Sequence, residues 1–209
     1  MTAGPRTAEA LLALDEITRR LRRECPWDRE QDERSIVPHT VEEAYELADA
    51  AHSGDDAKLL DELGDVLFQV YFLSLLMEER GAGNLASVAD ACREKLVRRH
   101  PHVFGSRTAE DAVTVVANWD EIKRGENDAA GPFGDLPENL PATLYAKKVL
   151  RRAGLTAKAP TGGADEFEAM GERLLGVVQA AADAGVDPEL ALRAAADGVR
   201  ARVERAPVS

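Results

Sequence analysis

Apolar residues recur every three or four positions along most of the chain, with charged residues on the opposite side. This spacing is typical of amphipathic α-helices. It predicts helices over residues 8–24, 40–53, 56–79, 85–100, 108–124 and parts of 142–206. A sustained alternation rich in β-branched residues, which would indicate strands, does not occur in the sequence. We therefore predict an all-α fold, a helical bundle.

Turn-forming residues separate these helices and predict where each begins. Residues 26–38 contain two prolines and many charges, so we expect an irregular connector there. Thr40 would cap the next helix, with Glu43 three places later. Gly54 marks a tight turn, and Asp56 would cap the helix that follows it.

A second cluster of turn formers divides the chain. Residues 125–141 contain three glycines and three prolines, which predicts a linker. We expect one helical domain at residues 1–124 and a helical tail at residues 142–209.

The tail resembles a degenerate, truncated second copy of the first domain. Residues 170–175 echo residues 63–68, and Gly185 to Pro188 would form the turn between two helices of the tail. At the position equivalent to Glu62 the tail carries Ala169. The tail has therefore lost most of the acids of the first copy.

Four carboxylates are placed symmetrically about the turn at Gly54. Glu46 and Glu62 each lie eight residues from this glycine, and Glu43 and Asp65 each lie eleven residues from it. An antiparallel helical hairpin would bring these acids together, and like charges in contact repel unless cations neutralise them. Carboxylate oxygens suit Mg²⁺, with Mn²⁺ as a substitute, so the pattern predicts a divalent-metal site. The alternative is a solvated acidic face without a ligand.

Basic residues follow on later helices and could hold the charge of a phosphorylated substrate. Lys95 and Arg99 lie four residues apart, with Arg98 beside them, and Trp119 and Lys123 lie four residues apart on the next helix. Guanidinium and ammonium groups are natural partners of a polyphosphate, and a tryptophan beside them could pack on a base or on the core. Ordinary surface charge is the alternative interpretation.

Composition limits the other function classes. The formal net charge of −12 disfavours nucleic acid as a partner, because phosphate backbones bind dense basic surfaces. The longest apolar run, residues 66–77, is too short to cross a bilayer, so no membrane partner is expected. Cys25 and Cys92 lack metal-ligand spacing and fit a reducing compartment, which predicts a cytoplasmic protein.

From Leu11 to Lys123 the sequence resembles the MazG-type nucleoside triphosphate pyrophosphohydrolases. The residues that carry the resemblance are Cys25-Pro26-Trp27-Asp28 with Gln31, Glu42-Glu43-x-x-Glu46, Glu62-x-x-Asp65, Lys95 to Phe104, and Trp119 to Lys123. Each motif is weak alone, but their order and spacing together are specific.

The resemblance implies an all-α bundle related to the dimeric dUTPases, assembled as a homodimer or a higher homo-oligomer. It implies Mg²⁺-dependent hydrolysis of (deoxy)nucleoside triphosphates to the monophosphate and pyrophosphate, as nucleotide-pool house-cleaning. The implied metal ligands are Glu43, Glu46, Glu62 and Asp65, and the implied substrate contacts are Lys95, Arg98, Arg99, Trp119 and Lys123. Glu42 is our candidate for the base that activates water, with an indirect role through the metal ligands as the alternative.

Three other functions fit the same residues. One is a phosphoribosyl-ATP pyrophosphohydrolase, and another is an enzyme like the dUTPases or dCTPases, because the metal chemistry is shared. The third is a non-catalytic helical module that binds a partner.

Overall fold

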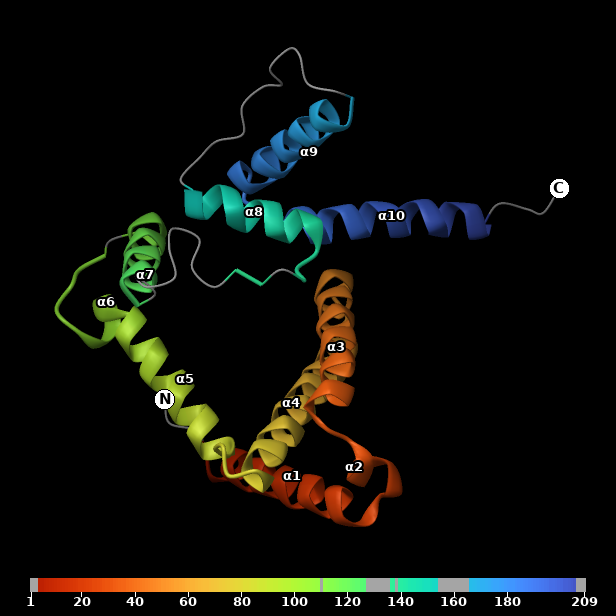
Figure 1. Ribbon diagram of the computed structural model, residues 1–209, viewed down its shortest axis with the longest axis vertical. Coiled ribbons are helices and arrows are strands. Elements are labelled where there is room, and N and C mark those ends of the chain that lie inside the picture. Colours follow the sequence, from red (N-terminus) through yellow and green to blue (C-terminus); the bar gives the residue numbers. More distant parts are fainter. Residues whose placement is uncertain (1–3, 110, 127–135, 138, 154–165, 206–209) are drawn as a thin grey trace. The chain divides into compact units, whose positions relative to one another are not determined.

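The computed structural model describes residues 4–109, 111–126, 136–137, 139–153 and 166–205, and the regular elements in this part of the chain are all helices (Figure 1). The described helices are α1 (Pro5–Glu24), α2 (Pro26–Glu30), α3 (Glu33–Ser53), α4 (Asp56–Glu79), α5 (Leu85–Arg99), α6 (Pro101–Phe104), α7 (Ala112–Glu126), α8 (Ala142–Ala153), α9 (Glu166–Asp183) and α10 (Pro188–Arg205). The prediction of an all-α protein is confirmed. None of these helices has both the length and the apolar content needed to span a bilayer.

The chain divides into two compact units, Met1–Thr108 and Ala109–Ser209. Helices α1 to α6 belong to the first unit, and α7 to α10 belong to the second. Most of the predicted linker at 125–141 lies outside the described residues, so its structure is not part of this description.

Helices α3 and α4 form an antiparallel hairpin and lie side by side (Figure 1). The turn is at Gly54, whose φ of +72° is the left-handed conformation that glycine adopts without a steric penalty. Asp55 then caps α4, because its side chain accepts hydrogen bonds from the backbone N–H groups of Ala57 and Lys58. The predicted turn is confirmed, but the predicted cap at Asp56 is wrong by one residue.

Helix α3 begins at Glu33, well before the predicted start at Thr40. Asp32 and Ser35 form a capping box at this end: the Asp32 side chain accepts from the Ser35 N–H, and the Ser35 hydroxyl accepts from the Asp32 N–H. Pro38 therefore lies inside the helix, and the predicted irregular connector is wrong over most of its length. The capping box and the burial of Ile36 stabilise a turn that the proline alone would disfavour.

The core of the first unit lies where α3 packs on α4. Ile36, Phe72 and Leu76 are buried there, with Phe68 and Leu73 against them. Closer to the turn, the hairpin is filled by Ala50, which is 0% exposed.

Helix α1 is tied to the far end of α4 by polar contacts. Arg22 forms an ion pair with Glu79 at 2.8 Å and donates to the backbone carbonyls of Asp28 and Gln31. The hydroxyl of Tyr71 also donates to a backbone carbonyl of α1, at 3.3 Å. These bonds fix the segment around Cys25-Pro26-Trp27-Asp28 against the hairpin.

In the second unit, α8 contacts both α9 and α10. Lys147 of α8 forms an ion pair at 2.8 Å with Asp187, which also caps the start of α10. Gly185, with a φ of +70°, makes the turn between α9 and α10, as predicted.

Candidate metal centre

Three acids from the two arms of the hairpin meet at one point. Glu43 comes from α3, and Glu62 and Asp65 come from α4. One carboxylate oxygen of each lies within 4.8 Å of the others. The spacing about Gly54 brings Glu43 and Asp65 to the same level, and the three-residue spacing puts Glu62 on the same face as Asp65.

Glu62 is the buried member of this acid cluster, defined here as Glu43, Glu62 and Asp65. Its side chain belongs to a residue only 7% exposed, and its Oε2 has no hydrogen-bond partner among the described residues. Burial raises the pKa of Glu62, and the neighbouring charges of Glu46 and Asp65 raise it further. A buried carboxylate oxygen without a partner is costly unless a cation binds it.

Glu43 is perturbed in the same direction. Burial raises the pKa of Glu43 most, and the charges of Asp65, Glu46 and Glu62 raise it further. The donor set is therefore three carboxylates, from two helices, that repel one another when all are ionised. Hard oxygen donors of this kind fit Mg²⁺ or Mn²⁺, and Mg²⁺ leaves part of its coordination shell to water and substrate phosphates.

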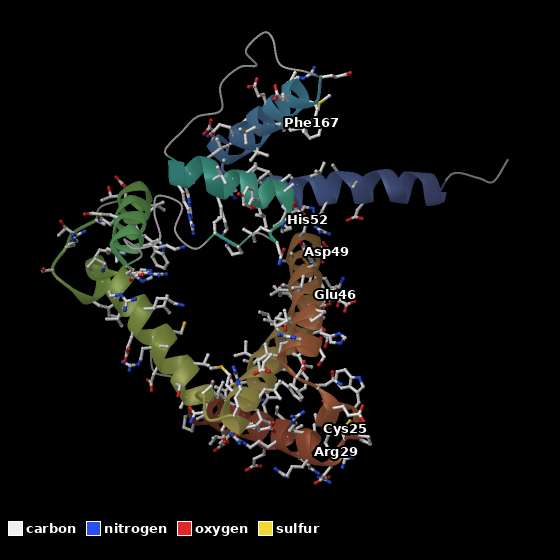
Figure 2. All side chains as sticks on the ribbon, in the orientation of Figure 1. Cys25, Arg29, Glu46, Asp49, His52 and Phe167 are labelled. Atoms are coloured by element: carbon white, nitrogen blue, oxygen red, sulfur yellow. The ribbon has the colours of Figure 1, made fainter. Side chains whose placement is uncertain are left out.

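The fourth predicted ligand lies beside the cluster. Glu46 is exposed on α3 (Figure 2), and its charge acts on both Glu43 and Glu62. The structure brings three of the four acids within 4.8 Å of one another and leaves Glu46 close enough for its charge to act on two of them.

Glu42 is exposed on α3 and faces a histidine. Its Oε2 lies 3.7 Å from Nδ1 of His39, one turn earlier on the helix. The ring of His39 in turn meets the exposed indole of Trp27 edge to face, with ring centroids 5.9 Å apart.

Sequence reasoning missed Lys58 and His39 as neighbours of the acids. The charge of Lys58 lowers the pKa of Glu62, against the larger effects that raise it. Both could have been found from helical spacing, because Lys58 precedes Glu62 by four residues and His39 precedes Glu42 by three.

The predicted basic residues lie on two other helices. Lys95 and Arg98 are exposed and Arg99 is half-buried on α5, a helix that contacts α4. Trp119 and Lys123 are half-buried on α7, which belongs to the second unit.

Comparison with known proteins identifies the family of the chain. The sequence profile of the MazG nucleotide pyrophosphohydrolase domain matches residues 31–104. A protein of Thermotoga maritima named nucleoside triphosphate pyrophosphohydrolase/pyrophosphatase MazG is 34% identical over 193 residues, which cover 82% of this chain and 74% of that protein. The chain belongs to the MazG family.

Other MazG relatives are longer than the part matched here. The nucleoside triphosphate pyrophosphohydrolase of Escherichia coli strain K12 is 41% identical over 131 residues, which cover 61% of this chain and 50% of that protein. The chain thus spans about half the length of this curated relative. A crystal structure of a mazG-related protein from Thermotoga maritima aligns with a TM-score of 0.47 at 27% identity, covering 56% of this chain and 98% of that one.

The matched MazG domain contains the whole acid cluster together with Lys95, Arg98 and Arg99. Trp119 and Lys123 lie beyond its last residue. The resemblance drawn from the motifs is confirmed at the level of the family.

Proposed function

We propose that this protein hydrolyses (deoxy)nucleoside triphosphates to the monophosphate and pyrophosphate with a divalent cation held by the acid cluster. The observation that carries the proposal is the buried, unpartnered Glu62 oxygen between two other carboxylates, inside the part of the chain that matches the MazG domain. The names of the relatives support the class of reaction.

Glu43, Glu62 and Asp65 would hold the cation, with Glu46 completing the set from the edge of the cluster. Mg²⁺, when bound, supplies positive charge that acidifies a coordinated water and offsets the charge of the triphosphate. Mn²⁺ would substitute, since it accepts the same oxygen donors.

The water that attacks phosphorus must lose a proton to a base. We assign this role to Glu42, which is exposed and adjoins Glu43 in the sequence. The Oε2 of Glu42 lies 3.7 Å from Nδ1 of His39, so the imidazole is a ring next to the proposed base on its own helix.

Substrate contacts would come from Lys95, Arg98 and Arg99 on α5 and from Trp119 and Lys123 on α7. The cationic groups would bind the phosphates, and the tryptophan would pack on the base. Because these five residues and the acids lie within residues 42–123, we assign catalysis to residues 1–124 and no catalytic role to residues 142–209.

A homodimer is the expected assembly. One side of α4 exposes a stripe of large apolar residues, namely Leu60, Leu63, Leu67 and Val70, which are 37–74% exposed. This α4 stripe lies about 150° around the helix from Glu62 and Asp65 at 3.6 residues per turn, so pairing through it leaves the acids free. The acidic composition and the two free cysteines support a cytoplasmic location without a nucleic-acid partner.

The test is a panel of ribonucleoside and deoxyribonucleoside triphosphates with separate detection of pyrophosphate and orthophosphate. We expect pyrophosphate as the first product, formed in the presence of Mg²⁺ and abolished by EDTA. Orthophosphate as the first product would reject the mechanism. The absence of turnover with every triphosphate, together with no Mg²⁺-dependent shift in melting temperature, would favour a non-catalytic helical module.

A further inference from the structure

Two neutral polar residues face each other inside the hairpin of α3 and α4, next to the acid cluster. The Thr40 hydroxyl on α3 lies 3.5 Å from Oε1 of Gln69 on α4. Gln69 is 7% exposed, and Thr40 is half-buried. We call these two residues the polar pair. Buried polar groups normally have their hydrogen bonds satisfied, so the partners of this pair must be accounted for.

The amide of Gln69 is only partly satisfied. Its contact with Thr40 is long for a hydrogen bond, and it is the one side-chain hydrogen bond that Gln69 makes among the described residues. Both N–H groups of Nε2 therefore lack an acceptor there. Nε2 is not among the fully sealed, unpartnered side-chain atoms of the described residues, so it keeps some contact with solvent. A buried amide that is half satisfied and still reachable has the properties of a ligand contact.

The polar pair lies one helical turn from the acid cluster. Thr40 precedes Glu43 by three residues, so the two share a face of α3. Gln69 follows Asp65 by four residues, so these two share a face of α4. At 1.5 Å per residue the pair lies about 4.5–6 Å from these acids along the helix axes. A ligand whose charged end is held at the acids can therefore place its neighbouring group at the pair.

The next positions along the hairpin are apolar. Ile36, four residues before Thr40, and Phe72, three residues after Gln69, are buried in the core. An apolar side chain would pack well at position 69, and a buried polar residue in a helix contact can serve to fix the register of the helices. That structural role is best served by a fully bonded amide, which Gln69 does not have.

The tail offers a comparison within the same chain. Residues 107 positions further on correspond to the helix of the acids, and there Ala169 takes the place of Glu62. By the same offset Gly176 takes the place of Gln69. The amide is thus absent from the copy that lacks the buried acid, which supports a role for Gln69 at the acid cluster.

We propose that the polar pair binds the 3′-hydroxyl of the nucleotide substrate. This inference rests on the proposed function, which places the phosphates of the nucleotide at the acid cluster. The pentose is bonded directly to the α-phosphate, so it is the part of the substrate that lies one turn away. Its 3′-hydroxyl is neutral, as the pair is, and it is the hydroxyl that ribonucleotides and deoxyribonucleotides share.

The donors and acceptors of the pair match this hydroxyl. An N–H of Gln69 donates to O3′, and the 3′-hydroxyl donates its own proton to Oγ1 of Thr40. The Thr40 hydroxyl donates in turn to the backbone carbonyl of Ile36, which lies 3.4 Å away. A phosphate oxygen would instead favour the cationic side chains of α5, because charged donors bind it more strongly.

The test compares two sugars that differ in this hydroxyl. The probes are a 2′-deoxynucleoside triphosphate and the 2′,3′-dideoxy compound with the same base, each also as its α,β-methylene analogue, which blocks the bond to be hydrolysed. Calorimetry with Mg²⁺ should show the wild-type chain binding the deoxy analogue about tenfold more tightly than the dideoxy analogue. The two triphosphates should differ by a similar factor in kcat/KM.

Substitution of Gln69 should remove this preference. Gln69→Leu replaces the amide by an apolar group of similar size, so the ratio of the two dissociation constants should fall to about one. The matched control is Ser74→Ala. Ser74 is also a buried polar residue of α4, 3% exposed, but its hydroxyl donates to the Val70 carbonyl at 2.7 Å. This variant should keep the wild-type ratio.

Thr40→Val is a second variant, of nearly the same shape, that removes the acceptor of the 3′-hydroxyl and should also lower the ratio. Circular dichroism checks that each variant is folded, and Thr40→Val provides the readout should Gln69→Leu misfold. A ratio between two ligands is insensitive to a general loss of folded protein, because that loss weakens the binding of both.

Two results would overturn the proposal. One is a wild-type chain that binds the deoxy and dideoxy analogues equally, and the other is a wild-type ratio retained in the folded variants at positions 40 and 69. Failure of the proposed function gives a different pattern, in which no triphosphate is hydrolysed but the analogues still bind with a measurable ratio. A wild-type chain that binds neither analogue would refute both proposals.

Discussion

Helices α4 and α9 share an outward face and a terminal turn but differ on the inward side. α4 directs Glu62 and Asp65 into the acid cluster, whereas the equivalent positions of α9 hold Ala169 and Glu172. Both helices expose large apolar residues on the other side, Leu60, Leu63, Leu67 and Val70 on α4 and Phe167, Met170, Leu174 and Val177 on α9. Both also end in a Schellman motif, with Gly81 after α4 and Gly185 after α9. The comparison teaches that the exposed apolar residues and the acid cluster occupy separate sides of α4, so the acids can be absent from a helix that keeps the apolar face.

The sharpest test of this contrast replaces one acid on each helix, Glu62 on α4 and Glu172 on α9. Glu62→Gln should lower the rate of pyrophosphate release about 100-fold or more, because it removes a negative ligand at the buried centre of the cluster. Glu172→Gln makes the same chemical change on α9 and should leave the rate unchanged. Steady-state kinetics with saturating Mg²⁺ measures both. An equal loss in the two variants would remove the functional difference between the helices.

Metal binding should stabilise the first unit through the same residue. At a Mg²⁺ concentration about 100 times the dissociation constant, the wild-type chain should gain about 2.7 kcal/mol in the free energy of unfolding. The Glu62→Gln variant should gain much less free energy of unfolding from Mg²⁺, and the Glu172→Gln variant should gain as much as the wild type. Urea unfolding with and without EDTA gives these values. A Mg²⁺ effect that survives Glu62→Gln would place the cation elsewhere.

The shared terminal turn can be tested by its glycines. Gly81→Ala and Gly185→Ala should each lower the free energy of unfolding by about 1 kcal/mol, because alanine is strained at positive φ. Neither glycine has an atom within 4 Å of a built Cβ, so strain is the only cost expected. Gly125→Ala, at a glycine without positive φ, is the control. Unequal losses at positions 81 and 185 would show that the two Schellman motifs do not carry the same backbone strain.

The smallest effect is a pH dependence of the metal-free protein. The folded-state pKa values of Glu43 and Glu62 are raised, so the native state binds protons more tightly than the unfolded state. Their contribution is present below the ordinary carboxyl pKa of 4.5 and is lost as pH rises through the folded values. In EDTA, the Glu62→Gln variant should therefore lose less stability than the wild type between acidic and neutral pH. A wild-type and variant pair with identical pH profiles would contradict the burial of this charge.

The hairpin and its acids were predictable because the signals are local. Helical spacing, one glycine and equal distances from Gly54 were enough to bring Glu43 and Asp65 together. The cap at Asp55 was missed because two adjacent aspartates satisfy the same sequence rule, and only the hydrogen bonds distinguish them.

The start of α3 was missed for a different reason. Pro38 indicated a break, while the capping box uses serine at Ser35, where the usual signature has glutamate or glutamine. The burial of Glu62 was also beyond the sequence, since it depends on how closely the two arms pack.

The packing at Ala50 sets the distance between the two arms of the hairpin near its turn. This residue is fully enclosed near the turn, one helical turn beyond Glu46, and it has the smallest side chain after glycine. A bulkier residue there would wedge the arms of the hairpin apart and widen the gap that Glu62 and Glu43 span. The separation of the carboxylates in the proposed metal site is therefore set in part by the volume of one uncharged methyl group outside the acid cluster.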